Sequence, residues 1–259
     1  MKIELITSRD NQRLANARKV RDGKVPGMMF IEGRRLVEEA IRSDIAIEEC
    51  FFSDDFGDDG LRGAFHGRVF EVHAKIFRSL ADTGQPQGVI VVAKRPESLS
   101  FKLVESSAVP VVVFLNEINN PSNLGAVIRT AEAADAAGVI ISDNSADVFS
   151  PKALRAAMGS SFRLPIWSGV NFDEVIRWAN GQSFVKTAAD ISGEMLYTAV
   201  DWTKKRLLIF GSEAHGLRDA DLDKVGEKII IPMGQDVESL NLAVAAGVIL
   251  FEARRQGGK

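Results

Sequence analysis

The sequence is poor in cysteine and histidine, and this narrows the chemistry that the chain can use. Its 259 residues include one cysteine, Cys50, and three scattered histidines, His66, His73 and His215. A single cysteine cannot form an intrachain disulfide, and no cluster of cysteine and histidine suggests a zinc site. We therefore expect no metal and a reducing, cytoplasmic compartment.

Long apolar runs and an excess of one charge are also missing. No apolar stretch approaches the roughly 18 residues of a membrane helix, so we expect no membrane partner. The polar start from Met1 to Asp10 does not resemble a signal peptide. The net charge of −3 is not that of a general polyanion binder. Residues 1–42 nevertheless hold ten Lys/Arg against six Asp/Glu, an excess compatible with phosphate contacts or with an ordinary solvated helix.

The apolar pattern divides the chain into two α/β parts. The polar stretch 94–98 is the best linker candidate, so we predict domains at residues 1–98 and 99–259. In the first part the pattern predicts helices over 10–22 and 33–42, strands over 50–52, 69–72 and 89–93, and a loop over 57–67.

The second part alternates strand and helix. The pattern predicts strands over 109–115, 139–141, 184–187, 207–210 and 229–231, and helices reaching about residue 137 and spanning 150–159 and 239–255. Such alternation is typical of a parallel sheet with helices on both faces. We therefore expect the functional residues at the carboxyl ends of these strands.

Three strand ends carry unusual residues. Residues 116–125 hold four asparagines and run into Arg129, four residues after Gly125. Residues 210–217 read Phe-Gly-Ser-Glu-Ala-His-Gly-Leu, and residues 231–234 read Ile-Pro-Met-Gly before Ser239-Leu240-Asn241. Each turn alone also fits simple structural capping. No G-x-G-x-x-G follows a strand and no P-loop occurs, so the common nucleotide-binding motifs are not indicated.

Together, in order and spacing, the three turns resemble the three motifs of the SpoU (TrmH-like) branch of the SPOUT methyltransferases. Residues 119–131, 211–217 and 231–245 carry that resemblance. It implies an α/β SPOUT domain with a deep C-terminal trefoil knot and a homodimer with active sites at the subunit interface. Residues 6–8, 18–19 and 30–40 resemble the L30e-like RNA-binding domain that precedes it in some members.

The resemblance also implies S-adenosylmethionine as cofactor and a site for it. Four residues would line the cofactor pocket: Gly211, Ile231, Met233 and Leu240. Composition alone shows neither the cofactor nor the knot.

Five further residues receive catalytic roles from the resemblance. Asn123 and Arg129 would handle the target ribose and its phosphate, Ser239 and Asn241 would hold the loop and face the reaction, and Glu213 would be an acceptor or loop organiser. A guanidinium stays protonated in proteins, so we interpret Arg129 as an electrostatic clamp rather than a free base. The alternative for Arg129 is a surface ion pair with Glu132.

The expected function is methylation of a ribose 2′-hydroxyl in structured RNA, with analogy favouring ribosomal over transfer RNA. Three alternatives stay open: a transfer RNA 2′-O-methyltransferase, a non-catalytic RNA-binding homologue, and a SPOUT enzyme that methylates a base nitrogen.

Overall fold

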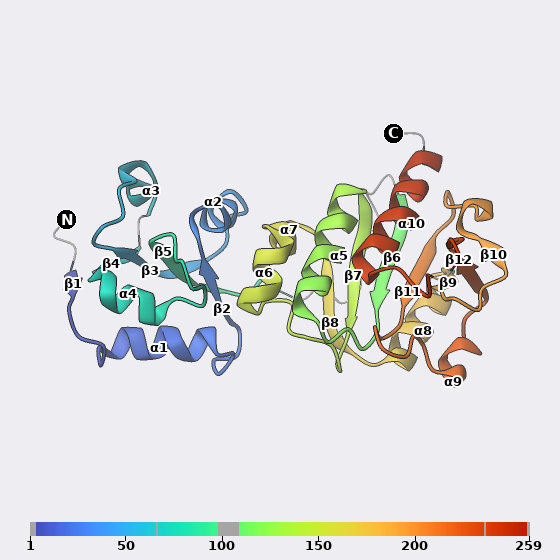
Figure 1. The fold of residues 1–259 in the computed structure, drawn as a ribbon, viewed down its shortest axis with the longest axis horizontal. Coiled ribbons are helices and arrows are strands. Elements are labelled where there is room, and N and C mark those ends of the chain that lie inside the picture. Colours follow the sequence, from blue (N-terminus) through green and yellow to red (C-terminus); the bar gives the residue numbers. More distant parts are fainter. Residues whose placement is uncertain (1–3, 66, 98–108, 236, 258–259) are drawn as a thin grey trace. The chain divides into compact units, whose positions relative to one another are not determined.

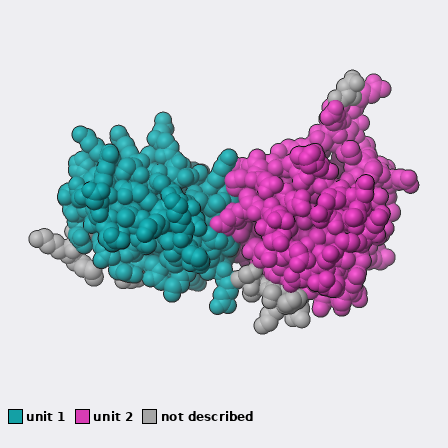
Figure 2. Space-filling view, turned by 90° about the horizontal axis from the view of Figure 1, so that it is seen from below, with its two compact units in different colours: residues 1–97, 149–162 teal, residues 98–148, 163–259 magenta. Residues whose placement is uncertain are grey.

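The computed structural model describes residues 4–65, 67–97, 109–235 and 237–257. Its contacts divide the chain into two compact units (Figure 2). Unit 1 holds residues 1–97 and 149–162, and unit 2 holds residues 98–148 and 163–259. The sequence did not predict that residues 149–162 group with unit 1. The expected boundary after residue 98 lies outside the described residues.

Unit 1 is built on a five-stranded mixed sheet in the order β1-β4-β3-β5-β2. Its strands are β1 (Glu4–Ile6), β2 (Met28–Glu32), β3 (Ile47–Ser53), β4 (Arg68–Val72) and β5 (Val89–Lys94). Its helices are α1 (Gln12–Arg21), α2 (Arg34–Arg42), α3 (Asp59–Gly63), α4 (Ala74–Leu80) and α6 (Pro151–Ala157). The expectation of a loop over 57–67 is wrong for residues 59–63, which form α3; Asp58 caps this helix by accepting a hydrogen bond from the Leu61 amide at 3.0 Å.

Alternation along the strands separates two faces of this sheet. Phe51 belongs to the core cluster that contains the buried residues of α1 and α4. The next residue, Phe52, points the other way and stacks on Phe56, with ring centroids 5.2 Å apart. Figure 1 accordingly shows α1 and α4 on one face of the sheet and α2 and α3 on the other.

Unit 2 is built on a seven-stranded sheet in the order β10-β12-β9-β11-β6-β7-β8, and each of its described pairings is parallel. The strands are β6 (Val109–Leu115), β7 (Ala136–Ser142), β8 (Ile166–Val170), β9 (Val185–Ala189), β10 (Met195–Leu196), β11 (Arg206–Phe210) and β12 (Glu227–Ile230). The helices are α5 (Pro121–Ala133), α8 (Phe172–Gly181), the 3₁₀ turn η1 (Tyr197–Ala199), α9 (Asp219–Leu222) and α10 (Leu242–Gln256). The short helix α7 (Ser160–Arg163) lies at the boundary, with its first three residues in unit 1 and Arg163 in unit 2. The expected parallel α/β sheet is confirmed.

Two helices of unit 2 differ in length from the prediction. The helix expected to reach about residue 137 ends at Ala133, and Asp135 takes a left-handed φ of 61° before β7 begins. The last helix begins at Leu242 rather than at Ser239, because Asn241 is its N-cap. Residues 239–241 therefore belong to a loop, where their side chains are available to a ligand. None of the described helices is long and apolar enough to cross a bilayer.

Candidate active site

A cleft of about 650 Å³ lies in unit 2, where several parallel strands end. Residues at the carboxyl ends of β9, β11 and β12 form part of its wall, as expected for this class of sheet. Eight of the nine predicted site residues line it: Asn123, Gly211, Glu213, Ile231, Met233, Ser239, Leu240 and Asn241. Arg129 is the one that does not. The three turns that are far apart in sequence thus meet at one place.

Gly211 lets the loop after β11 fold back on itself. Ser212 and Gly216 form an antiparallel bridge, with the Gly216 amide donating to the Ser212 carbonyl at 2.8 Å. A Cβ on Gly211 would lie 2.2 Å from the Gly216 carbonyl carbon and 2.3 Å from the Leu217 nitrogen. No side chain fits there, so the glycine is required by the tight loop that presents Glu213.

A chain of side-chain hydrogen bonds joins the three turns. The Asn123 amide donates to Oε1 of Glu213. The Asn241 amide in turn donates to Oδ1 of Asn123 at 3.2 Å. Asn123 comes from α5, Glu213 from the loop after β11, and Asn241 from the start of α10. These hydrogen bonds therefore fix the relative positions of elements from three parts of the sequence.

The groups at the two ends of this series of hydrogen bonds determine which atom donates and which accepts in each bond. Oδ1 of Asn241 accepts the Ala243 amide at 2.9 Å as the helix cap, so its NH₂ group must face Asn123. An ionised Glu213 can only accept, so the NH₂ group of Asn123 must face the carboxylate. Each amide is thus assigned by its partners. The second N–H of Asn123 stays available for a ligand in the cleft.

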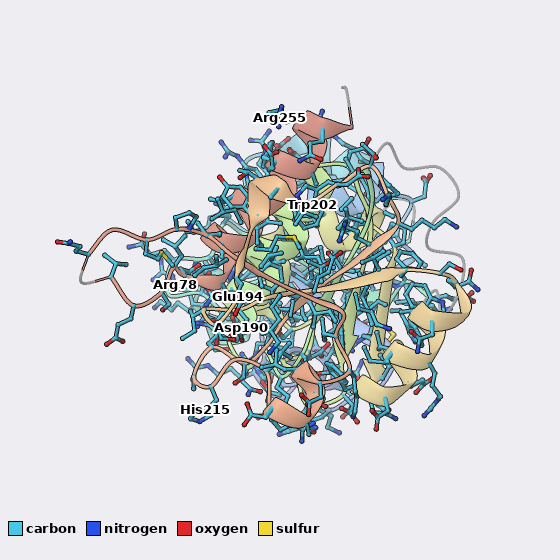
Figure 3. The ribbon with its side chains drawn as sticks, turned by 90° about the vertical axis from the view of Figure 1, so that its right-hand side faces the viewer. Arg78, Asp190, Glu194, Trp202, His215 and Arg255 are labelled. Atoms are coloured by element: carbon cyan, nitrogen blue, oxygen red, sulfur yellow. The ribbon has the colours of Figure 1, made fainter. Side chains whose placement is uncertain are left out.

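The charge of the cleft is negative. Its described lining includes the carboxylates of Asp190, Glu213 and Glu238 and holds no lysine or arginine. His215 also lines it, but Figure 3 shows this exposed side chain at the outer tip of its loop. The cleft therefore favours a cationic ligand and lacks a group that would pair with a phosphate.

Sequence reasoning missed Asp190, which follows β9 and is labelled in Figure 3. Its Oδ1 accepts hydrogen bonds from the backbone amide of Ser192 at 2.8 Å and from the hydroxyl of Ser192 at 2.6 Å. Its Oδ2 faces Gly216, 3.6 Å from where a Cβ would be. A carboxylate directly after a strand was the available signal, but this strand carries the weakest apolar pattern of the sheet.

Arg129 is exposed and lies outside the cleft of its own chain. It makes no hydrogen bond or ion pair within the described part of the chain. The alternative pair with Glu132 does not form, because Glu132 is bound by Arg163 at 2.6 and 2.9 Å. Arg129 and Asn123 are six residues apart in α5, so at about 100° per residue they project from different faces.

Thiol and metal chemistry find no support among the described residues. Cys50 is buried in unit 1, and burial raises the pKa of its thiol. No group of three or more His, Cys, Asp or Glu side chains gathers as a metal site in the described ranges.

Comparison with known proteins identifies this arrangement. The model of the SpoU rRNA methylase family matches residues 110–251, more than half of the chain and all three turns. The chain belongs to the SpoU rRNA methylase family. A second model, the MRM3-like substrate binding domain, matches residues 11–91 of this SpoU methylase.

Relatives and solved structures extend the similarity over both units. The 23S rRNA (guanosine(2553)-2′-O)-methyltransferase RlmP of Bacillus subtilis is 28% identical, over 96% of this chain and 98% of its own. Mitochondrial rRNA methyltransferase 3A of Danio rerio is 28% identical, over 94% and 67%. The AdoMet-bound rRNA methyltransferase of Sinorhizobium meliloti superposes with a TM-score of 0.85 at 29% identity, over 98% of each chain. The SpoU methylase described here shares that α/β fold.

Proposed function

We propose that this SpoU methylase transfers the methyl group of S-adenosylmethionine to a ribose 2′-hydroxyl of ribosomal RNA. The observation that carries the proposal is the hydrogen-bonded chain from Asn241 through Asn123 to Glu213, which assembles the three motif turns around one acidic cleft. The two relatives described above, which are similar to this chain over both units, are named for ribosomal RNA, and this favours that substrate over transfer RNA.

The cleft suits this cofactor in size, polarity and charge. About 650 Å³ is within the usual range of pockets that enclose a molecule of this size. Ile231, Met233 and Leu240 offer an apolar wall for a flat aromatic ring, while the loop of Gly211 offers backbone groups. The three carboxylates of the lining favour a sulfonium cation. S-adenosylmethionine bound there supplies an electrophilic methyl group.

The residues of the cleft then have to position the ribose oxygen. The second N–H of Asn123 would donate to a ribose oxygen, and the hydrogen bond to Glu213 would hold that amide in orientation. Ser239 and Asn241 precede the first residue of α10, and both line the cleft. Positioning of this kind supplies several kcal/mol of rate enhancement in well-oriented reactions.

A second copy of the chain would complete the site. The cleft holds no cation for a phosphate among its described lining residues, whereas Arg129 is exposed outside it. Helix α10 also exposes apolar side chains: Val244 and Phe251 are each 51% exposed and lie seven residues apart, on one face. We infer that this face packs against a second copy and that Arg129 reaches the partner's cleft as an electrostatic clamp.

Two measurements test the proposal. Ribosomal RNA from cells lacking the gene is incubated with the protein and S-adenosylmethionine, digested to nucleosides and examined by mass spectrometry. The expected product is a 2′-O-methylated nucleoside; a methylated base would indicate base-nitrogen chemistry, and methylation only of transfer RNA would indicate the other substrate. Calorimetric titration with the cofactor separates an enzyme from a non-catalytic RNA-binding homologue, which would give no heat.

Shared sites are tested by mixing two inactive variants, Arg129→Ala and Asn123→Ala. If the sites combine residues of two copies, the mixed dimer regains one complete site and part of the activity. No recovery on mixing would indicate that each chain carries its own complete site. The C-terminal knot, the L30e-like character of unit 1 and a cytoplasmic location remain predictions.

A further inference from the structure

The two helical faces of unit 1 differ sharply in charge. Residues 7–24 and 73–81, which form α1, α4 and the segments next to them, hold eight Lys/Arg and two Asp/Glu. Residues 34–44 and 54–65, which form α2, α3 and adjoining loops, hold four Lys/Arg and seven Asp/Glu. Because these pairs of helices cover opposite sides of one sheet, the unit is basic on one side and acidic on the other (Figure 1).

Much of the positive charge on the α1–α4 side is not neutralised. Arg9, Lys19, Lys75 and Arg78 are exposed and form no ion pair in the described part of the chain. Arg18 donates only to neutral acceptors, the Arg9 carbonyl at 3.0 Å and the Ser79 hydroxyl at 3.5 Å. These five cations, here called the α1–α4 patch, therefore keep their charge available to a ligand.

Short contacts hold the patch together across the two helices. Arg18 links the segment before α1 to α4. Arg21 reaches the last carbonyls of α4, donating to Leu80 at 3.0 Å and to Ala81 at 3.3 Å. Lys75 and Arg78 are three residues apart in α4 and so project from the same side. The cations are therefore carried by two helices that hydrogen bonds hold together, and not by a flexible segment.

Most of the cations on the opposite side form ion pairs within unit 1. Arg34 binds Glu38 at 3.0 Å and Asp58 at 2.9 Å. Arg42 binds Glu39 at 2.7 Å. Arg35 is exposed and forms no ion pair among the described residues, and Glu32 and Glu38 each lie three positions from it in sequence. This side would repel a polyanion.

We propose that the α1–α4 patch is the surface through which unit 1 holds the phosphate backbone of the RNA substrate. The inference rests on the proposed function, since an RNA methyltransferase must bind a polyanion while its cofactor cleft is acidic. Phosphate contacts of this kind supply affinity without sequence preference and weaken as salt displaces them. Figure 2 looks onto this side of unit 1.

The test compares two double variants of the full chain that each remove two charges. Lys75→Gln/Arg78→Gln alters the patch, and Arg35→Gln/Arg42→Gln is the matched control on the acidic side. Binding to purified, protein-free large-subunit ribosomal RNA is measured across a series of salt concentrations. We expect the patch variant to bind more weakly and its slope of log affinity against log salt to become shallower by about 1.4 to 1.8, roughly 0.7 to 0.9 per lost phosphate contact. The control should keep the wild-type slope.

The patch lies outside the cleft, so each variant should bind the cofactor as the wild type does. Normal cofactor binding and an unchanged thermal unfolding temperature then show that each variant is folded. Equal slopes for the two variants, or a larger loss in the control, would overturn the assignment of this surface. A wild-type chain that binds the cofactor but no ribosomal RNA would instead overturn the proposed substrate, and with it the patch. These two failures are distinguishable because the second appears before any substitution is made.

Discussion

Asn241 donates a hydrogen bond to Asn123 at 3.2 Å across 118 residues of sequence, while its own side-chain oxygen caps α10. One side chain therefore starts the last helix and anchors the chain of amides that ends on Glu213. The two roles use different atoms, so substitution can separate them.

Replacing Asn241 with Asp should leave the fold intact and impair the site. Aspartate caps helices as well as asparagine does, but it cannot donate to Asn123 and adds a charge near Glu213. We expect thermal stability close to wild type and methyl transfer reduced about tenfold, the range of one lost hydrogen bond. Asn241→Ala should in addition lose about 1 kcal/mol of stability with the cap. Equal activity of Asn241→Asp and wild type would contradict a role for the amide chain.

Gly211→Ala should disrupt the loop after β11. The added methyl group would meet backbone at 2.2 and 2.3 Å, and backbone there cannot yield without moving Glu213. We expect a stability loss of about 1–3 kcal/mol and weak cofactor binding by calorimetry. Gly234→Ala is the matched control, because a Cβ at Gly234 would meet nothing within 4 Å. Comparable behaviour of the two variants would show that the tight loop is not needed.

Arg129→Lys should lose most activity and keep its affinity for the cofactor. Lysine retains the charge but not the planar fork that holds a phosphate or a developing alkoxide with two parallel bonds. We expect kcat to fall about 100-fold, in line with the loss of one preorganised electrostatic donor. Cofactor affinity should not change, since the proposed clamp holds the phosphate of the RNA and not the cofactor. Near-normal turnover would rule out the clamp.

Phe251→Asp should give a monomer. Phe251 is 51% exposed on the face of α10 that we assign to the dimer, and a buried unpaired carboxylate opposes association. Size-exclusion chromatography with light scattering should show half the wild-type mass, together with loss of methyl transfer. Ala220→Asp adds the same charge on an exposed residue of α9 and should remain dimeric. A dimeric Phe251→Asp variant would move the interface elsewhere.

Glu227→Gln should weaken the sheet of unit 2 without touching the cleft chemistry. The buried guanidinium of Arg206 donates to Glu227, to the Thr187 hydroxyl at 2.8 Å and to the Asp201 carbonyl at 2.7 Å. Glutamine removes the only carboxylate among these acceptors, and we expect the free energy of unfolding to fall by about 1–3 kcal/mol. Denaturant unfolding measures the change. Glu194→Gln, at an exposed position labelled in Figure 3, should leave stability unaltered.

The sequence was sufficient for the fold class and for most of the lining of the cleft. Continuous apolar strands such as Val109–Leu115 identify a parallel sheet, and the parallel arrangement by itself brings the turns after the strands to one edge. The strand-end turns, together with the resemblance to the SpoU family, therefore placed Gly211 and Asn241 at the cleft. Helix ends were less predictable, because a single capping side chain decides them.

The direction of Arg129 could not be predicted in the same way. Gly125 lies four residues before Arg129 in α5 and is buried, whereas Arg129 is exposed. Which face of α5 packs depends on α10, whose Gly247 lies against Thr130. Contacts between helices far apart in sequence leave no local signal. The path of the predicted knot also depends on contacts between segments far apart in sequence, so it leaves no local signal either.

The opposite charges on the two sides of unit 1 also bear on kinetics. A body with separated charge experiences a torque in the field of a polyanion, so it turns its basic side forward before any contact forms. A larger fraction of encounters with RNA then occurs in the productive orientation, and the association rate constant rises. Because ions screen this field over about 10 Å at 0.1 M, raising the salt concentration should slow the first encounter with RNA.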